Sequence, residues 1–313
     1  MLKRVRIGTR GSALALWQAD FVENELRRRY PELELERVII KTQGDRDQKS
    51  SLTRIGGQGV FTKTIEEALL QEKIDIAVHS LKDLPSAMSQ GLELAAIPPR
   101  GPVEDVLITQ GGLTLNQLPA GARIATGSIR RRCQLLQMRP DLRMEDLRGN
   151  IDTRLRKLHE QNLDGIIMAL AAIKRLDIEG LYFQVFKSNE MIPAIGQGAI
   201  GIQIRSNDKP LKTMLEKLNH IPTYYGVVAE RSLLKTLDTG CQFPVGGYGR
   251  VSDAQLTLLG FVGSEDGKIL IKDQVSGPME QAEELGVKLA EQLLKKGARQ
   301  LLQKFRSENE IKE

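Results

Sequence analysis

The stretch that most constrains the fold is IDIAVHSLKDLP, residues 74–85, where an apolar run stops abruptly at polar residues. Residues 74–78 are too continuously apolar for a strand with one solvated face, so they predict a parallel strand that helices cover on both sides. Ligands of open α/β sheets bind beyond the carboxyl ends of such strands. Ser80, Lys82 and Asp83 fall at that end and are candidate site residues. Taken alone, the stretch is equally compatible with a turn acid and a solvated lysine.

The order β-α-β-α-β is predicted twice along the chain. The first series consists of strand 5–9, a helix that begins after Ser12, strand 33–42, helix 61–73 and the strand described above. A polar, glycine-bearing loop precedes its second helix, and loops of this length are usually lids or disordered. The second series consists of strand 123–126, helix 129–138, strand 144–147, helix 153–161 and strand 165–169. Two such series predict an α/β protein with two similar domains.

Segments rich in glycine and proline divide the chain further. Residues 98–102 and 193–198 indicate two crossings between the domains, which would form a hinge, and strand 199–204 is expected to return to the first domain. The last third predicts a small α+β domain with helix 224–237, strands 256–262 and 268–273, and a final helix 280–297. We expect residues 1–99 and 196–217 to form domain 1, residues 100–195 domain 2, and residues 218–313 domain 3.

The composition favours a globular protein in a reducing compartment. With 313 residues, 41% of them hydrophobic and 27% charged, the chain is long enough for two or three domains, each with a core. The N-terminus shows no apolar signal stretch and no run long enough to span a bilayer, so we expect a cytoplasmic protein without a membrane partner. Two distant cysteines predict no disulfide framework, and three scattered histidines predict no metal site.

The net charge of +5 indicates an anionic partner. Only 4% of the residues are aromatic, which leaves few platforms for stacking bases, and the sequence carries no zinc-finger, zipper or RNA-binding signature. We therefore expect a small anionic ligand and no nucleic acid.

Basic residues follow several of the predicted strands. Arg130, Arg131 and Arg132 occupy the first turn of a helix, where each cation should cost about 0.3–1 kcal/mol because the helix end is already positive. A bound carboxylate or phosphate would reverse the sign of that effect. The alternative is a solvated basic face. Arg10 and Lys82 follow two other strands, and Arg148 and Arg154 flank the start of another helix.

Four basic strand ends in a two-domain α/β chain predict a cleft for a small molecule that carries several negative charges. Hydroxyl groups at Ser12, Ser80, Thr126 and Ser128 add neutral donors. Among these cations, the carboxylate of Asp83 is suited to stabilise a developing positive charge.

The two cysteines receive different predictions. Cys241 lies in the loop TGCQFPVG just after a helix, where a thiol can be exposed, and this favours a covalent role over simple burial. Cys133 lies in the middle of a helix, and we assign it no chemical role.

Six motifs together resemble those of the porphobilinogen deaminase family, also called hydroxymethylbilane synthases. They occur in family order over essentially the whole chain: GTRGSALALWQ, VHSLKDLP, TGSIRRRCQL, LRGNIDTRL, AIGQGA and AERSLLKTLDTGCQFPVG. The resemblance implies an enzyme that joins four porphobilinogen molecules head to tail with loss of ammonia and releases linear hydroxymethylbilane. It also implies a covalent dipyrromethane cofactor on which the chain grows.

The resemblance also implies roles for single residues. Asp83 matches the catalytic aspartate, and Cys241 matches the cysteine that holds the cofactor through a thioether. The residues matching cofactor contacts are Lys82, Ser12, Ser80, Thr126, Ser128, Arg130 and Arg131. The residues matching arginines that bind substrate carboxylates are Arg10, Arg148, Arg154 and Arg175. The fold implied is two periplasmic-binding-protein-like domains with a hinge plus a small C-terminal α+β domain, in a monomer.

The chain departs from the family pattern at a few positions. Arg54 and Gln58 stand in the long loop where lysines are common, and Gln58 loses the charge. Thr239 replaces a usual glycine before the cysteine loop. The rival interpretation is a non-enzymatic anion-binding or effector-sensing protein with the same two domains, which would need the arginines but neither Asp83 nor an accessible Cys241.

Overall fold

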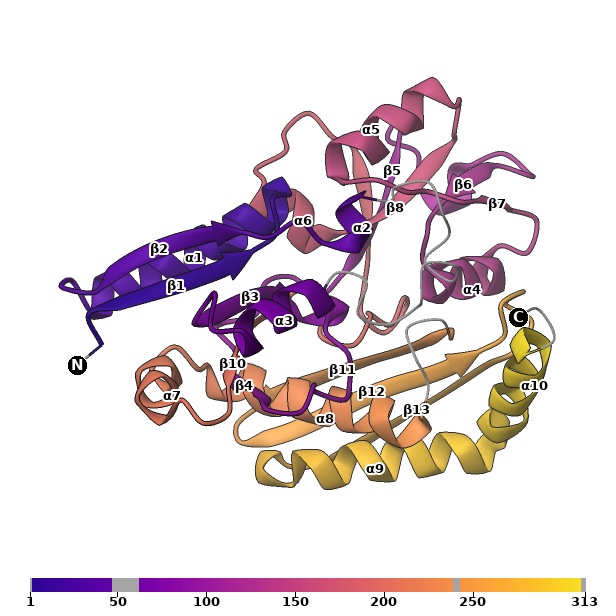
Figure 1. Cartoon of the computed structure of the whole chain (residues 1–313). Helices are drawn as coiled ribbons and strands as arrows, with labels where there is room; N and C mark the ends of the chain where they lie inside the picture. Colours follow the sequence, from indigo (N-terminus) through magenta and orange to yellow (C-terminus); the bar gives the residue numbers. More distant parts are fainter. Residues whose placement is uncertain (1, 47–61, 239–242, 311–313) are drawn as a thin grey trace. The chain divides into compact units, whose positions relative to one another are not determined.

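The computed structural model describes residues 2–46, 62–238 and 243–310, which form two compact units (Figure 1). The first unit comprises Met1–Gly101 and Gly196–Tyr224, and the second comprises Pro102–Ile195 and Tyr225–Glu313. The division into three domains stays a prediction. None of the helices that the described residues form is both long and apolar enough to span a bilayer.

The first unit is built on a five-stranded mixed sheet in the order β2-β1-β3-β10-β4. Its strands are β1 (Arg4–Thr9), β2 (Glu34–Ile39), β3 (Ile76–Ser80), β4 (Leu92–Ala96) and β10 (Ile200–Arg205). β1 runs parallel to β2 and β3, whereas β10 is antiparallel to β3 and β4. The prediction that residues 199–204 return to the first sheet is confirmed. The sheet as a whole is mixed, because β3 has one parallel and one antiparallel neighbour.

Helices cover both faces of this sheet. They are α1 (Ala13–Arg29), the one-turn α2 (Gln43–Arg46), α3 (Lys63–Leu70) and α7 (Lys209–Glu216), with a 3-10 turn, η1 (Leu81–Asp83), after β3. Ile76 and Val78 of β3 pack into the core shared with α1 and α7, while Ala77 packs into the core on the side of α3. The predicted burial of β3 on both faces is therefore confirmed, and polar groups can reach solvent only where the strand ends.

The second unit repeats this architecture in a sheet of order β7-β6-β8-β5-β9. Its strands are β5 (Asp105–Thr109), β6 (Arg123–Ala125), β7 (Arg143–Glu145), β8 (Gly165–Ala169) and β9 (Phe183–Phe186). Its helices are α4 (Ile129–Met138), α5 (Ile151–Glu160), α6 (Leu170–Arg175) and the 3-10 turn η2 (Leu115–Gln117). Three parallel strands are again followed by an antiparallel one, β5. The matching strand orders confirm the prediction of two similar α/β halves.

The C-terminal part of the second unit is a three-stranded antiparallel sheet covered by helices. It contains β11 (Val245–Ser252), β12 (Gln255–Gly263), β13 (Leu270–Pro278), the 3-10 turn η3 (Met279–Gln281), α9 (Ala282–Leu293) and α10 (Arg299–Glu310), with α8 (Ile221–Leu237) preceding them. Figure 1 shows α9 along one face of this sheet, where Leu285, Leu289 and Leu293 are buried in a shared core. The predicted small α+β part is confirmed.

Two features of this part differ from the sequence prediction. The helical backbone is interrupted at Gly297, where φ is 111°, in agreement with the predicted helix end, but a further helix, α10, follows and was not predicted. Glycine adopts a positive φ at little cost, so the chain can change direction at Gly297 and begin a new helix directly after it. The sequence analysis did not predict strand β11, because the segment is rich in glycine. Packing requires one of these glycines, since a Cβ on Gly249 would lie 2.6 Å from the carbonyl oxygen of Gly226.

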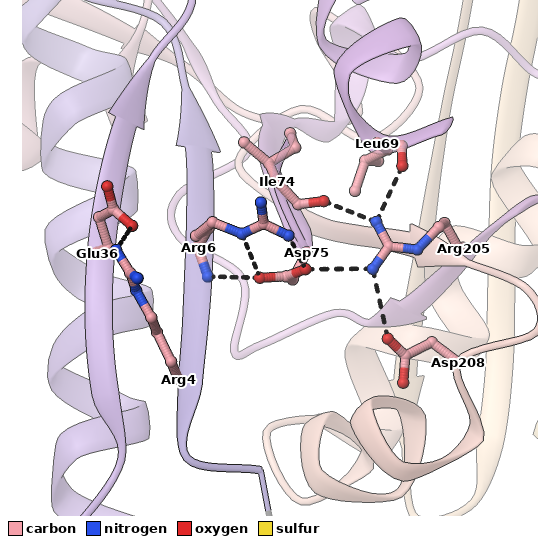
Figure 2. Close-up of polar contacts among 8 residues, drawn as sticks. All are labelled: Arg4, Arg6, Glu36, Leu69, Ile74, Asp75, Arg205 and Asp208. Atoms are coloured by element: carbon pink, nitrogen blue, oxygen red, sulfur yellow. Dashed lines mark hydrogen bonds and ion pairs between the residues drawn. The ribbon is translucent and has the colours of Figure 1, made fainter. Parts of the chain in front are cut away.

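A network of charges joins three strands of the first sheet at the end opposite to Ser80 (Figure 2). Asp75 accepts hydrogen bonds from the amide and Nε of Arg6 at 2.8 and 3.0 Å. Its Oδ1 also pairs with Arg6 Nη2 at 2.8 Å and with Arg205 Nη2 at 3.2 Å. Arg205 further donates to the carbonyl oxygens of Leu69 and Ile74. Asp75 therefore ties β1 and β10 to the start of β3.

We expect Asp75→Asn to lower the free energy of unfolding by about 2–3 kcal/mol, because Arg6 and Arg205 lose a shared and largely buried acceptor. The matched control is Glu36→Gln, which removes an exposed partner of Arg4 from the same sheet and should cost less than about 1 kcal/mol. Urea unfolding of both variants measures the difference. Equal losses would show that Asp75 contributes no more than a surface ion pair.

The same network predicts an acid-dependent loss of stability. Burial acts to raise the pKa of Asp75, but the hydrogen bonds from Arg6 and Arg205 outweigh it and lower the pKa below 3.8. The contribution of Asp75 is therefore complete above the unfolded value and is lost as the pH falls through the folded value. Asp75→Asn should remove this part of the acid sensitivity.

Candidate functional site

Residues at the carboxyl ends of β1 and β3 line one small cavity in the first unit. Its volume is about 70 Å³, which is room for several water molecules. The cavity brings together four residues singled out from separate motifs, namely Arg10, Ser12, Ser80 and Asp83. The other lining residues are Leu14, Ala15, Thr62, Val78 and His79. The expectation that these strand ends converge is met for this half of the chain.

The turn that carries Asp83 is held by its buried first residue, Leu81. The amide of Leu81 donates to the carbonyl oxygen of Ala199 at 3.0 Å. A Cβ on Gly201 would lie 2.7 Å from Leu81 Cδ1, so glycine is needed for this close approach. The AIGQGA motif, interpreted from the sequence as a chain crossing, thus also supports the turn. Asp83 itself is exposed and Lys82 is half-buried.

Two lining hydroxyl groups are fixed by partners within the first unit. Ser12 begins α1 and accepts a hydrogen bond from the amide of Ala15 at 3.4 Å. Ser80 exchanges hydrogen bonds with the buried amide side chain of Gln18, at 2.8 and 3.2 Å. Gln18, which the sequence analysis did not select, therefore orients Ser80 from α1.

Arg10 is held by an acid that the sequence analysis also missed. Its Nη2 lies 2.5 Å from Asp45 Oδ1, and Asp45 Oδ2 accepts from both the amide and the hydroxyl of Thr42, at 3.1 and 2.7 Å. Burial acts to raise the pKa of Asp45, but the bonds from Arg10 and Thr42 outweigh it and lower the pKa. An ionised Asp45 therefore fixes the position of the Arg10 guanidinium at the end of β1.

A buried chain of hydrogen bonds lies on the α3 side of the sheet. His79 Nε2 lies 3.1 Å from Gln203 Oε1, Gln203 Nε2 donates to Glu66 Oε1 at 2.7 Å, and Ser89 donates to Glu66 Oε2 at 2.8 Å. Because the carboxylate only accepts, Gln203 presents its oxygen to His79, and the imidazole donates from Nε2. Burial lowers the pKa of His79 to about 4, against an opposing effect of Glu66. The imidazole beside the cavity is therefore neutral at neutral pH.

In the second unit, the basic first turn of α4 is paired with an internal acid. Asp105, fully buried at the start of β5, lies 2.6 Å from Arg130 Nη2 and 2.8 Å from Arg131 Nη2. The two guanidinium groups also donate to the carbonyl oxygens of Ile192 and Ile167. Burial lowers the pKa of Arg130, and the charge of Asp105 opposes this effect. A solvated basic face is therefore wrong for Arg130 and Arg131, although Arg132 is half-buried and pairs with Asp146.

The remaining cations of the second unit follow the neighbouring strands β7 and β8. Asn150 begins α5 by accepting from the amide of Thr153 at 2.9 Å. Arg154 donates from Nε to the carbonyl oxygen of Gly149 at 2.8 Å, and Lys157 donates to that of Arg148 at 3.2 Å. The motif LRGN thus forms a tight turn into α5 that carries half-buried Arg148 and Arg154.

Three further predicted site residues belong to this end of the second sheet. Thr126 is buried after β6 and accepts a hydrogen bond from the amide of Ser128 at 3.2 Å. Arg175 ends α6, which follows β8, and burial lowers its pKa to about 10. Because β6, β7 and β8 are adjacent and parallel, the segments that carry these predicted site residues all leave the sheet at its carboxyl end.

The cysteines differ in what the structure says of them. Cys133 is buried with Ile192 and Phe261, and burial raises the pKa of its thiol to about 12, so the reactive thiolate is disfavoured. Cys241, the predicted attachment point, lies outside the described residues, as do Arg54, Gln58 and Thr239. Within the described ranges, no three His, Cys, Asp or Glu side chains are grouped to hold a metal ion.

Comparisons with known proteins bear on both units. Residues 5–213 match the family model of the porphobilinogen deaminase dipyromethane cofactor binding domain, and residues 224–295 match that of the porphobilinogen deaminase C-terminal domain. The porphobilinogen deaminase of Geotalea uraniireducens is 47% identical over 301 residues, covering 96% of this chain and 94% of the relative. That of Carboxydothermus hydrogenoformans is 44% identical over 306 residues, covering 98% of each chain. Solved structures that match include the probable amino-acid ABC transporter extracellular-binding protein of Bacillus subtilis, with a TM-score of 0.44 and 12% sequence identity. The match covers 75% of this chain and 97% of that protein.

We expect the buried state of His79 to make stability fall as the pH falls below 6.5. Between pH 6.5 and about 4 the unfolded chain binds a proton on this imidazole and the folded protein does not. The unfolding free energy should therefore drop by about 2 kcal/mol more between pH 7 and pH 5 in the wild type than in His79→Gln, whose side chain does not titrate. Urea unfolding at both pH values measures this, and an NMR titration should find His79 neutral at pH 5. Equal pH dependence of the two proteins would contradict it.

Proposed function

The chain belongs to the porphobilinogen deaminase family, and on this premise we propose how its own residues serve the reaction. The enzyme forms hydroxymethylbilane from porphobilinogen, with a dipyrromethane cofactor bound to its first family domain. The rival interpretation, a non-enzymatic sensor of anions, is therefore set aside. What remains to be assigned is the role of each side chain.

Asp83 is proposed as the catalytic residue. The single observation that supports this most is that its exposed carboxylate lines one cavity with Arg10, Ser12 and Ser80. A carboxylate accepts hydrogen bonds from a pyrrole N–H and offsets positive charge on the ring. When ammonia leaves porphobilinogen with the electron pair of the broken C–N bond, the ring nitrogen shares the positive charge that remains. A fixed negative charge beside that ring lowers the energy of this step.

Arg10, Arg148, Arg154 and Arg175 are proposed to bind the acetate and propionate groups of the substrate. Each follows the carboxyl end of a strand or the helix after it, where the backbone is fixed. The ion pair with Asp45 supports this role for Arg10, because it holds the guanidinium at the cavity in one orientation. Charge-assisted bonds of this kind are stronger than neutral ones.

The second unit offers donors that fit the acidic side chains of the cofactor. Arg130 Nε is buried and lacks a hydrogen-bond partner among the described residues, and the two arginines carry one more charge than Asp105 neutralises. When bound, dipyrromethane supplies the primer ring to which the pyrroles are added. We propose that it is attached to Cys241 and contacted by Lys82, Ser12, Ser80, Thr126, Ser128, Arg130 and Arg131. We further propose three domains, a monomer and a cytoplasmic location.

The intact mass of the purified protein tests the attachment. It should exceed the mass of the sequence by two pyrrole units, and Cys241→Ser should abolish this increase because a hydroxyl group is a far poorer nucleophile than a thiolate. Cys133→Ala is the control, since the buried thiol of Cys133 is expected to have no covalent role. An active wild-type protein of unmodified mass would refute the assignment of Cys241.

The role of Asp83 is tested by separating its charge from its position. Asp83→Asn keeps the volume but loses the charge, so turnover should fall on the order of 10²–10³-fold. Asp83→Glu keeps the charge about one methylene further out and should retain partial activity, with enzyme-bound intermediates accumulating. Single-turnover assays with porphobilinogen, read by mass, measure both. Glu67→Gln, an exposed acid on α3, is the control and should keep the wild-type rate.

A further inference from the structure

Thr62 has a buried hydroxyl group for which the described residues offer no hydrogen-bond partner. Its side chain is only 1% exposed and lines the same cavity as Asp83. Of the other lining hydroxyl groups, Ser12 bonds to the amide of Ala15 and Ser80 bonds to Gln18. A buried hydroxyl group without a partner is costly to the folded state, and such groups are rare.

The position of Thr62 makes the missing bond more unusual. Thr62 immediately precedes α3, where a threonine hydroxyl ordinarily accepts from an amide of the first helical turn. Here the backbone at Thr62 is already helical, with φ −113° and ψ −34°, and the side chain makes no such bond. The carbonyl oxygen of Thr62 does start the helix, accepting from the amides of Ile65 and Glu66 at 2.9 Å. The hydroxyl group is thus left for a molecule in the cavity.

The charges around Thr62 favour an anionic group as its partner. The N-terminus of α3 carries partial positive charge, and Lys63 is exposed next to it. Arg10, which also pairs with Asp45, lines the same cavity. Glu66, one turn further along α3, is engaged by Gln203 and Ser89. Asp83, also in the lining, is the natural acceptor for an N–H group and would repel a second anion placed directly on it. A ligand with separate N–H and carboxylate groups therefore suits the two kinds of partner in this lining.

We propose that Thr62 is a further binding residue of this enzyme, whose hydroxyl group donates a hydrogen bond to a carboxylate of an acidic pyrrole while Asp83 accepts from the pyrrole N–H. The pyrrole is either the substrate or a cofactor ring, since both carry the same acidic side chains. This inference rests on the proposed role of Asp83 and extends it by naming the group that binds the other end of the ring.

The test compares Thr62→Val, which keeps the shape and removes the hydroxyl group, with Thr62→Ser, which keeps the hydroxyl group. In the holoenzyme, Thr62→Val should raise the KM for porphobilinogen about tenfold with kcat nearly unchanged, because a hydrogen bond to a charged group is lost in both ground and transition states. Thr62→Ser should stay close to the wild type. Thr64→Val, the same change on the same helix outside the cavity lining, is the matched control. The Tm of Thr62→Val without substrate should equal or exceed that of the wild type.

Two further measurements identify the source of the carboxylate. Porphobilinogen analogues in which either the acetate or the propionate group is replaced by an alkyl group should show equal KM for wild type and Thr62→Val in one of the two cases. If the carboxylate belongs to a cofactor ring instead, intact mass should show a reduced share of Thr62→Val protein carrying two pyrrole units. Either result supports the proposal.

Unchanged KM and unchanged cofactor content in Thr62→Val would overturn it, as would a lowered Tm with equal impairment of Thr62→Ser. Failure of the assigned function would show differently, because the wild-type protein would then make no hydroxymethylbilane. The proposal therefore fails separately from the assignment of the reaction.

Discussion

A strand that is buried on both faces can present polar side chains to solvent only where it ends, and this constraint organises both α/β sheets of the protein. β3 is covered by α1 and α7 on one face and by α3 on the other, so its first solvated side chains come at Ser80 and in the turn after it. β6 and β8 are buried in the same way in the second unit, where Thr126 directly follows β6 and the short helix that ends at Arg175 follows β8. Solvent-accessible polar side chains are therefore found at the ends of these strands, since the rest of each strand is covered by helices.

Charges placed so close to buried strands need partners, and the protein supplies several of them itself. Asp105 is fully buried between Arg130 and Arg131, and breaking such a group would leave uncompensated charge in the interior. Asp45 likewise offsets the charge of Arg10. Gln18 and Gln203 are the hydrogen-bond partners of the neutral side chains of Ser80 and His79. These partners are distant in sequence from the residues that they orient, so these side chains depend on a second element for their positions.

The sequence predicted the strand ends well and their supporting contacts poorly, for identifiable physical reasons. The run through Val78 and the basic turn at Arg130 are local patterns, and both correctly indicated where polar groups gather. The sequence analysis expected a bound anion at the basic turn, whereas the partner in the structure is the internal Asp105, which no local pattern connects to α4. Strand β11 was missed because its glycines serve close packing against Gly226, a contact that the sequence does not reveal. The helix end at Gly297 was predicted from the glycine, but α10 beyond it was missed.

The return of β10 to the first sheet has a consequence for how the chain is made. Ser80, at the end of the strand that leads to Asp83, pairs with Ile200, and the amide of Leu81 donates to the carbonyl oxygen of Ala199. While the ribosome is still synthesising the second sheet, β3 has a neighbour on one side only, and its other edge is an unpaired row of amides and carbonyls. The first unit can therefore be completed only after the second sheet has emerged, and until then the growing chain presents an open strand edge to which another chain, or a chaperone, can bind.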